Sequence, residues 1–491
     1  MLAATVLGSA AGFLDATVVN VALPDIGRDL DAGVAGLQWV VSGYTLTLGS
    51  VLLLGGALGD RYGRRRVFLV GIAWFVVASV LCAAAPSSGL LVGARLLQGV
   101  GAALLTPGSL ALIQASFPRA ERSRAIGLWS ALSGVGAALG PVVGGYLVEA
   151  ISWRAVFLLN VPIGVLVVLA ALRHVPESHD PTVSGRPDLP GSGLVLVGLG
   201  GLSFALIEGP GGQIGPGVAA AAVASGLVAL LAFVMVERRR THPMLPLAVF
   251  SSRTFTGANL VTFAVYAALA GVQFLLVIHL QTTLGYSPLA AGAATLPVTV
   301  IMLLLSSRSG LLAQRRGPRL QLVAGPFVLA IGTLLTARIG PGDSYAGTVL
   351  PAVIVFGLGL ATLVAPVTST ALAAVDERHA GVASGVNNAV SRVAGLAAVA
   401  GLPVAAGISG ADFSDPVAMQ HGFPIAMAVA AVLAAAGGLA AAFTIRNDVL
   451  GPAEPERPAL PCHYHCAVAG TPLEETTRAR VDADGVQPRC R

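Results

Sequence analysis

Lysine is absent from this 491-residue chain, and charged residues of all kinds make up only 11% of it. Hydrophobic residues make up 55%, and the mean hydropathy is +0.81. This composition leaves too little polar surface for a water-soluble globule, so it predicts a membrane protein. The missing lysine also removes the Gly-Lys-Ser/Thr triplet of a phosphate-binding loop, which argues against a nucleotide-driven step unless a partner supplies it.

Cysteine is scarce as well. Cys82 lies within an apolar run, and Cys462, Cys466 and Cys490 lie in the polar C-terminal stretch, so no disulfide framework is implied. The tract from Cys462 to Cys466 contains two histidines, but one short cluster without a second ligand pair is weak for zinc. We expect no metal and no cofactor. The apolar runs hold no catalytic constellation of residues either, so we do not expect an enzyme.

Apolar runs of about 20 residues, the length that crosses a bilayer, dominate the sequence. Fourteen of them are found, so the fold class predicted is an all-α membrane protein with fourteen transmembrane helices. The runs lie near 2–23, 35–58, 67–85, 89–116, 123–148, 155–172, 191–208, 215–236, 255–278, 289–312, 320–339, 346–372, 380–406 and 421–445.

The arginines between these runs are distributed unevenly. With the N-terminus inside, only Arg28, Arg154 and Arg338 fall in outer loops, and the other loop arginines are cytoplasmic. This asymmetry predicts a multi-pass protein of the bacterial inner (cytoplasmic) membrane with both termini in the cytoplasm. Because the arginines form short clusters between spans, they do not indicate a nucleic-acid partner.

An internal repeat relates the two halves of the chain. Residues 56–63 (GALGDRYG) and 310–317 (GLLAQRRG) share Gly, Leu, Arg and Gly at one fixed offset. Both copies follow an outward-to-inward span, so the halves are related by parallel repetition, as two six-helix bundles are. The predicted domains are an N-terminal six-helix bundle (1–172), an inserted helix pair (191–236), a C-terminal six-helix bundle (254–445) and a disordered tail (446–491).

Five strings in order carry a resemblance to a known family. The string at 56–66 (GALGDRYGRRR) resembles the loop signature of the major facilitator superfamily. The strings at 14–24, 95–103, 134–145 and 153–164 resemble motifs of its fourteen-helix drug:proton antiporter branch. The C-terminal half matches mainly by topology and by the degenerate repeat. The resemblance implies the major facilitator fold and a secondary antiporter that exports drugs or antibiotics in exchange for protons.

Asp15 lies in the middle of the first span, where a charge costs about 2.5–3.5 kcal/mol on insertion scales. Counted along their helices at ~1.5 Å per residue, Asp15 and Arg95 reach similar depths and could meet. A guanidinium favours the carboxylate and desolvation opposes it, so a site balanced between the two can exchange a proton. We expect proton coupling at Asp15 and Arg95, with a purely structural pair as the alternative.

The resemblance implies roles for two glycine-containing motifs. The loop motif would form a cytoplasmic gate, although simple positive-inside topology also explains its arginines, Arg64 among them. The fifth-span motif presents a bare helix face, bent at its proline, that could slide or pack statically. The gate residues are Gly56, Asp60, Arg61, Gly63 and Arg64, and those of the antiporter helix motif are Gly136, Gly140, Pro141, Gly144 and Gly145.

Polar residues deep in other spans are candidates for a cavity between the bundles. They are Asn20, Gln98, Asn387, Asn388 and Arg392. Arg392 could bind a counter-anion or bond backbone carbonyls instead. Glu208 and His279 fall near span ends, where we expect their polar heads to reach water.

The expected partners are protons, membrane lipid and a small neutral or monocationic hydrophobic substrate, and the protein is expected to work as a monomer. Two other functions stay open. One is a dedicated exporter of a single endogenous metabolite. The other is an uptake symporter, which the fifth-span motif disfavours.

Overall fold

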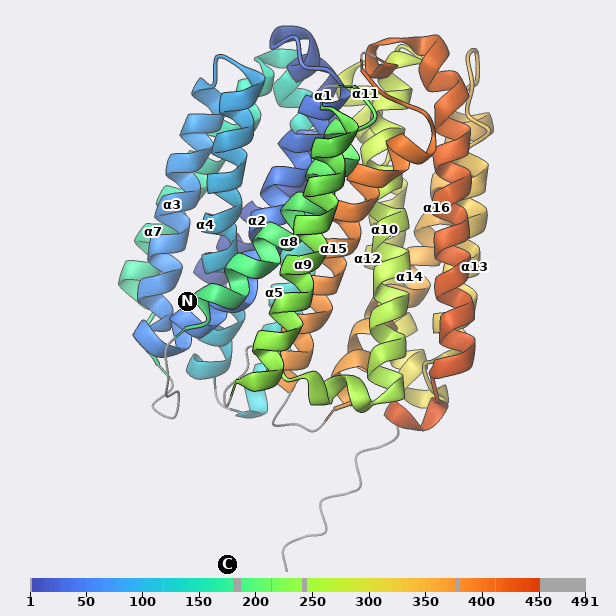
Figure 1. Cartoon of the computed structure of the whole chain (residues 1–491). Coiled ribbons are helices and arrows are strands. Elements are labelled where there is room, and N and C mark those ends of the chain that lie inside the picture. Colours follow the sequence, from blue (N-terminus) through green and yellow to red (C-terminus); the bar gives the residue numbers. More distant parts are fainter. Residues whose placement is uncertain are drawn as a thin grey trace, which may run out of the picture. The chain divides into compact units, whose positions relative to one another are not determined.

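The computed structural model describes residues 2–117, 119–179, 187–212, 214–240, 245–375, 380–410 and 412–450. Up to Leu450 these residues form one compact unit of helices, and no strand occurs among them (Figure 1). The predicted all-α class is therefore confirmed. The tract from Cys462 to Cys466 lies outside the described residues. Asn447–Leu450, expected to begin the tail, form a short 3-10 helix.

Two groups of helices and a pair between them in sequence make up the unit. The first group is α1 (Leu2–Asp29), α2 (Val34–Tyr62), α3 (Arg64–Ala84), α4 (Ser88–Ser116), α5 (Arg119–Ala150), α6 (Trp153–Leu158) and α7 (Asn160–His174). The pair is α8 (Leu189–Glu208) and α9 (Pro216–Arg239). The second group is α10 (Arg253–Thr282), α11 (Pro288–Ala294), α12 (Leu296–Arg316), α13 (Arg319–Thr336), α14 (Leu350–Ala373), α15 (Ala380–Ala405) and α16 (Pro416–Thr444).

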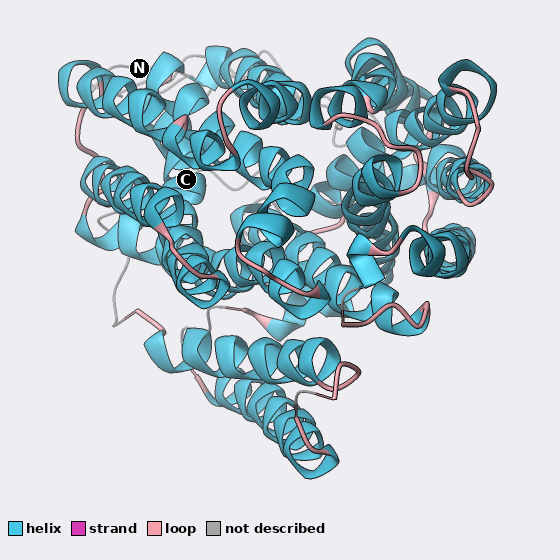
Figure 2. Ribbon diagram, turned by 90° about the horizontal axis from the view of Figure 1, so that it is seen from above, coloured by secondary structure: helices cyan, strands magenta, loops and turns pink. Residues whose placement is uncertain are grey.

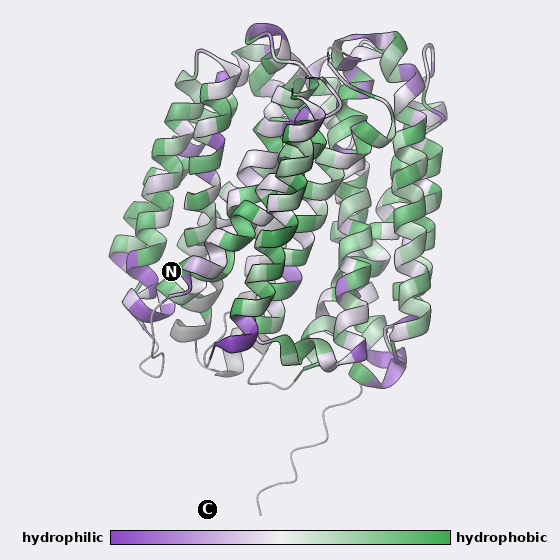
Figure 3. Cartoon of the chain, in the orientation of Figure 1, coloured by the Kyte–Doolittle hydropathy of each residue, from purple (hydrophilic) through white to green (hydrophobic). Residues whose placement is uncertain are grey.

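Thirteen membrane spans in the described residues have the length and hydropathy to cross a bilayer. α5 occupies the remaining predicted position, and its stretch Leu139–Ala150 is a shorter apolar helix by the same measure. Some spans consist of two helical pieces, as α6 with α7 and α11 with α12 do. Apolar residues dominate the middle of the helices, and polar ones gather at their ends (Figure 3).

We call α1–α7 the N-bundle and α10–α16 the C-bundle, because within each group the helices pack mainly on one another. The two bundles meet chiefly through α2 against α15 and α5 against α11, and α8 packs on α9, α2 and α15. Viewed from above, the helices lie side by side and nearly end-on (Figure 2). We call the end that holds Arg61, Arg64 and Arg319 the basic end, and the opposite end, which holds Asp29 and Arg154, the far end.

Candidate functional site

An ion pair lies in the interior of the N-bundle. Arg95 Nη1 on α4 is 2.5 Å from Asp15 Oδ2 on α1. Asp15 is 0% exposed and Arg95 is 1% exposed. Asp15 is near the midpoint of α1, so the pair sits deep in the apolar layer. The structure thus brings together the two residues that the sequence places at similar depths.

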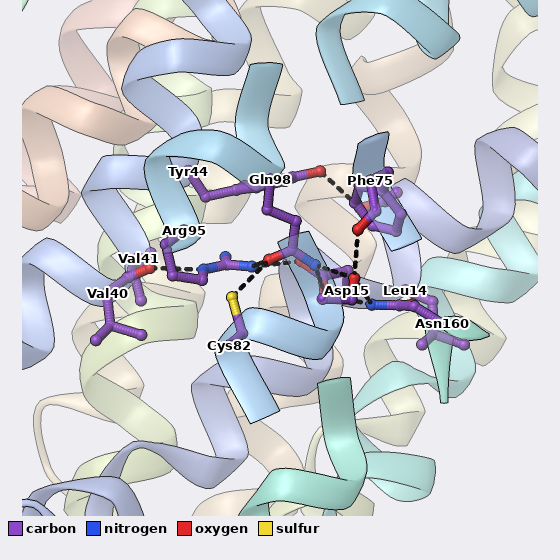
Figure 4. A network of polar contacts seen from close by, with 12 residues as sticks. Leu14, Asp15, Val40, Val41, Tyr44, Phe75, Cys82, Arg95, Gln98 and Asn160 are labelled. Atoms are coloured by element: carbon purple, nitrogen blue, oxygen red, sulfur yellow. Dashed lines mark hydrogen bonds and ion pairs between the residues drawn. The ribbon is translucent and has the colours of Figure 1, made fainter. Parts of the chain in front are cut away.

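Three polar side chains complete the hydrogen bonding of this pair (Figure 4). Gln98 Nε2 and Asn160 Nδ2 each donate to Asp15 Oδ1 at 2.8 Å. The Arg95 guanidinium also donates to Gln98 Oε1 at 2.6 Å, and Ser79 Oγ accepts from Gln98 at 2.8 Å and from Asn160 at 3.2 Å. Both carboxylate oxygens therefore have donors, which is the condition under which a buried charge is tolerated.

The remaining surface of Arg95 is covered by α2. Its Nε donates to the Val40 carbonyl at 2.9 Å, and its guanidinium lies 4.3 Å from the centre of the Tyr44 ring. The Tyr44 hydroxyl in turn donates to the Gly12 carbonyl on α1 at 3.2 Å. Tyr44 thus links the ion pair to the backbone of the helix that carries Asp15 (Figure 4).

The break between α6 and α7 positions Asn160. α6 ends at Leu158, and Asn160 begins α7 with Pro162 two residues later, a place that the proline tolerates because first-turn amides have no helical acceptor. The Asn160 Oδ1 atom is buried without a hydrogen-bond partner in the described part of the chain.

Sequence reasoning missed Ser79, Asn160 and Tyr44 as members of this network. Asn160 belongs to a string that resembles a family motif, yet nothing in that string says that its amide reaches the first helix. Ser79 and Tyr44 are ordinary residues of apolar spans. The available signal was their polarity at membrane depth, which demands a buried partner.

The gate residues lie at the basic end of the N-bundle. Arg64 at the start of α3 is paired with Asp60 on the last turn of α2 at 2.8 Å, and this pair is partly exposed. Gly63 joins the two helices at φ 111°, a conformation that favours glycine. A Cβ there would lie 2.8 Å from the Glu177 carboxylate, which accepts from the backbone amides of Arg65 and Arg66. In this conformation the charges therefore engage their own bundle.

The α5 glycines make two kinds of close contact. A Cβ at Gly136 would lie 2.9 Å from Ala10 Cβ, and one at Gly144 would lie 3.0 Å from the Val18 carbonyl, so these glycines pack on α1, as Gly140 does. Gly145 faces the C-bundle instead, because a Cβ there would lie 2.5 Å from the Pro288 carbonyl of α11. The Pro141 carbonyl similarly contacts Gly292. The motif therefore serves both the N-bundle interior and the interface between bundles.

Two of the candidate cavity-lining residues are bonded inside single bundles in this conformation. Gln98 is 0% exposed and belongs to the Asp15 network. Asn387 is buried within the C-bundle, where its amide donates to Asn259 Oδ1 at 3.2 Å and Thr262 Oγ1 at 2.8 Å on α10. Both side-chain amides form hydrogen bonds between helices of one bundle, since a polar group in an apolar layer needs a partner there.

Three other candidates lie closer to the interface between bundles. Asn388 on α15 is exposed, and Arg392 one helical turn further is partly exposed. The Arg392 guanidinium lies 5.6 Å from the centre of the Phe13 ring on α1 of the other bundle. Asn20, two turns from Phe13 on α1, has a buried Oδ1 without a hydrogen-bond partner among the described residues.

The expectation that the His279 side chain reaches water was wrong. His279 is 0% exposed, its ring stacks on Phe423 at 3.9 Å, and its Nε2 is 2.9 Å from the Ile339 carbonyl. Its Nδ1 is 3.1 Å from the Thr283 hydroxyl, so both nitrogens are satisfied inside the C-bundle. Glu208 accepts from the Trp39 indole at 2.8 Å, which ties the inserted pair to α2.

Hydrogen bonds between the bundles gather toward the far end. The Val34 amide donates to the Gly410 carbonyl at 2.7 Å, and Gln38 Nε2 donates to the Val399 carbonyl at 2.7 Å. Gln281 Nε2 donates to the Val21 carbonyl at 3.1 Å. Within the described ranges, no hydrogen bond or ion pair joins the two bundles at the basic end. The hydrogen bonds described between the bundles therefore join them at the far end.

Comparisons with known proteins agree on one family. A profile described as Major Facilitator Superfamily matches residues 5–399. The chain is 39% identical over 391 residues to the multidrug resistance protein Stp of Mycobacterium tuberculosis, covering 79% of this chain and 72% of that protein. It is 39% identical over 430 residues to a puromycin resistance protein of Streptomyces alboniger, covering 85% of each. A methylenomycin A resistance protein of Streptomyces coelicolor is 38% identical, covering 80% of this chain and 82% of that protein.

Solved structures support the fold. The POT family transporter PepTSo superposes with a TM-score of 0.66 at 15% identity, covering 90% of this chain and 96% of that one. A D-xylose-proton symporter superposes with a TM-score of 0.64 at 16% identity, covering 90% and 97%. At these identities the likeness concerns the fold alone.

Proposed function

The chain belongs to the Major Facilitator Superfamily, and from this premise we propose that it is a proton-coupled antiporter that exports small hydrophobic or amphipathic compounds, such as drugs and antibiotics, from the cytoplasm. The names of its relatives, which include multidrug, puromycin and methylenomycin A resistance proteins, support export of antibiotics. The basic end is then cytoplasmic, in keeping with the positive-inside rule.

One observation carries the coupling part of the proposal: a fully buried carboxylate, Asp15, is held by Arg95, Gln98 and Asn160 at mid-depth. An intramembrane ionisable residue is costly to keep, so a function is the default explanation for it. Protonation of Asp15 would weaken its attraction to Arg95 and release donors around it. The same helix α1 contacts α5 and α10, so a change at Asp15 can reach the interface between bundles.

The conformation described is inward-facing in this proposal. The far end is closed by bonds such as that of Gln38 to Val399, while the charges of Asp60 and Arg64 engage within one bundle. Rocking of the bundles to the outward-facing state would break the far-end bonds. It would also let the charges at Asp60 bond across to the other bundle and close the basic end. We also propose that α8 and α9 form a pair inserted between two six-helix bundles.

The geometry also bears on the charge of the substrate. Asp15 is paired with Arg95 and reaches no solvent, so it offers no free carboxylate to a cation in this state. A monocationic substrate therefore has no free carboxylate to pair with at Asp15 in this conformation. A dedicated exporter of one endogenous metabolite is the second candidate, since the resistance proteins among the relatives include single-antibiotic ones.

A susceptibility panel tests the function. Bacteria that lack their own efflux pumps would express the wild-type chain or Asp15→Asn at equal abundance and be exposed to puromycin, methylenomycin A and unrelated hydrophobic toxins. We expect the wild type to raise the inhibitory concentration of several compounds and Asp15→Asn to raise none. Protection against one compound alone would favour the dedicated exporter, and no protection against any would contradict drug export.

A further inference from the structure

Arg392 carries a charge in the middle of the membrane-spanning layer, at the interface between the bundles. It lies near the midpoint of α15 (Ala380–Ala405), about 18–20 Å from either helix end at ~1.5 Å per residue. That distance is too great for its side chain to reach either aqueous surface. A guanidinium at this depth pairs with an acid, bonds backbone carbonyls or faces a cavity between helices, and Arg392 is partly exposed.

The part of the chain that the structure describes supplies no such partner. The Arg392 side chain has no hydrogen bond and no ion pair there, and its one ring contact is with Phe13. The carboxylate at comparable depth, Asp15, is already bound to Arg95 and to the side-chain amides of Gln98 and Asn160. Of the other acidic residues described from residue 245 onward, Asp343, Asp412 and Asp415 lie at the far end. Asp448 lies in the 3-10 helix after α16 and is paired with Arg446.

One aromatic ring and one glycine of the N-bundle lie next to Arg392. The ring is that of Phe13 on α1, whose centre is 5.6 Å from the guanidinium. Gly49 on α2 faces Arg392 directly, since a Cβ on that glycine would lie 3.3 Å from Arg392 Cβ. A flat hydrophobic body that carries a negative group could pack on the Phe13 ring and place its charge against the partly exposed guanidinium.

We propose that Arg392 is the anion-recognition residue of the transport site, and that the preferred substrates are aromatic or otherwise hydrophobic compounds bearing one anionic group such as a carboxylate, phenolate or sulfonate. A guanidinium presents donors in a planar fork that matches such oxygens, and charge-assisted hydrogen bonds of this kind are strong. The bound anion would also neutralise Arg392 while the bundles move. This inference rests on the proposed export function and narrows its substrate class.

Three probes that share one ring test the proposal. Pyrene carrying a sulfonate, a sulfonamide or a trimethylammonium group offers an anion, a neutral group and a cation of similar size. Binding is measured by fluorescence anisotropy with purified protein in phosphatidylcholine nanodiscs, so that no anionic lipid headgroup competes. For the wild type we expect the sulfonate to bind about tenfold or more tightly than the sulfonamide, as a charge-assisted hydrogen bond supplies.

Arg392→Gln should bring this ratio to about one, because glutamine keeps hydrogen-bonding capacity but loses the charge. Arg392→Lys should keep part of the preference for the sulfonate, because lysine keeps the charge. If Arg392→Gln does not insert into the membrane, the binding ratios of Arg392→Lys and the wild type provide the test. Arg28→Gln, at an exposed arginine of the far end, is the control and should leave the ratio unchanged.

A wild-type preference for the cation or the neutral probe, no binding of the sulfonate, or an unchanged ratio in Arg392→Gln would overturn the inference. A vesicle assay separates this result from failure of the exporter proposal. If an imposed pH difference drives transport of the sulfonamide probe but the sulfonate probe binds no more tightly than the sulfonamide, the export proposal stands and the anion site is wrong. If the sulfonate binds through Arg392 but a pH difference drives none of the probes, the anion site stands and proton-coupled export fails.

Discussion

Arg95 Nη1 lies 2.5 Å from Asp15 Oδ2, and neither side chain reaches solvent. The pair is embedded among Gln98, Asn160 and Ser79, so each charge is satisfied by side chains of its own bundle. Loss of one member would leave the other charged and buried, which costs more than the pair itself contributes. This imbalance gives the network measurable consequences for stability and for transport.

Arg95→Met should destabilise the protein strongly, by about 3–5 kcal/mol, because the Asp15 carboxylate is left buried without its counter-charge. The measurement is the midpoint of thermal unfolding of purified protein in detergent. Asp25→Asn is the matched control: its pair with Arg28 is at the surface and contributes about 0–1 kcal/mol. Adding Asp15→Asn to Arg95→Met should restore part of the stability. A double variant that is less stable than Arg95→Met would contradict the pairing argument.

Asp15→Asn should abolish transport driven by a pH difference, because asparagine keeps the size of the side chain but cannot carry the proton. The assay is substrate accumulation in inside-out vesicles at matched protein abundance, with Asp25→Asn as the control that transports normally. Accumulation by Asp15→Asn against the substrate gradient would show that coupling lies at another residue.

Asp60→Asn should impair transport while leaving abundance unchanged. Its free energy of unfolding should stay within about 1 kcal/mol of wild type, since the pair with Arg64 is partly exposed. The expected defect lies in the step that closes the basic end. Arg66→Gln, which removes a 3.7 Å surface pair with Glu177, is the control with normal transport. Equal transport by Asp60→Asn and wild type in vesicles would leave the motif with only its topological role.

Gly145→Val should open the far end, because a Cβ at this position would lie 2.5 Å from the Pro288 carbonyl and 2.8 Å from the Leu289 amide. Cross-linking between Glu149→Cys and Leu289→Cys reports the closure, since the Glu149 carboxylate and the Leu289 amide are 3.4 Å apart. We expect efficient cross-linking in the parent and little in the Gly145→Val background, together with loss of transport.

The control for this prediction is Gly93→Val, because a Cβ at Gly93 meets nothing within 4 Å. It should cross-link and transport as the parent does. If Gly145→Val cross-links normally, the close approach of α5 and α11 is not what holds the far end shut.

The positions of most helices could be predicted from hydropathy alone, because a bilayer requires runs of a set length. The breaks inside spans were not predicted: α11 ends at Ala294 and α12 begins at Leu296 within one apolar run. Hydropathy does not register such a break, since both pieces are equally apolar. The resemblance of the motif strings supplied the family before any contact was known.

The sequence by itself determined the membrane class and the family, and it placed Asp15 and Arg95 at similar depths. It could do so because the bilayer sets the length of each span and makes a charge within a span conspicuous. Only the tertiary structure decided where the other polar groups go. Gln98 and Asn387 bond within their own bundles, and the His279 ring stacks on Phe423. Arg392 faces Phe13 of the other bundle and has no hydrogen bond or ion pair among the described residues. A helix has several faces at every depth, and which face meets its own bundle, the other bundle or lipid depends on packing between segments far apart in the chain.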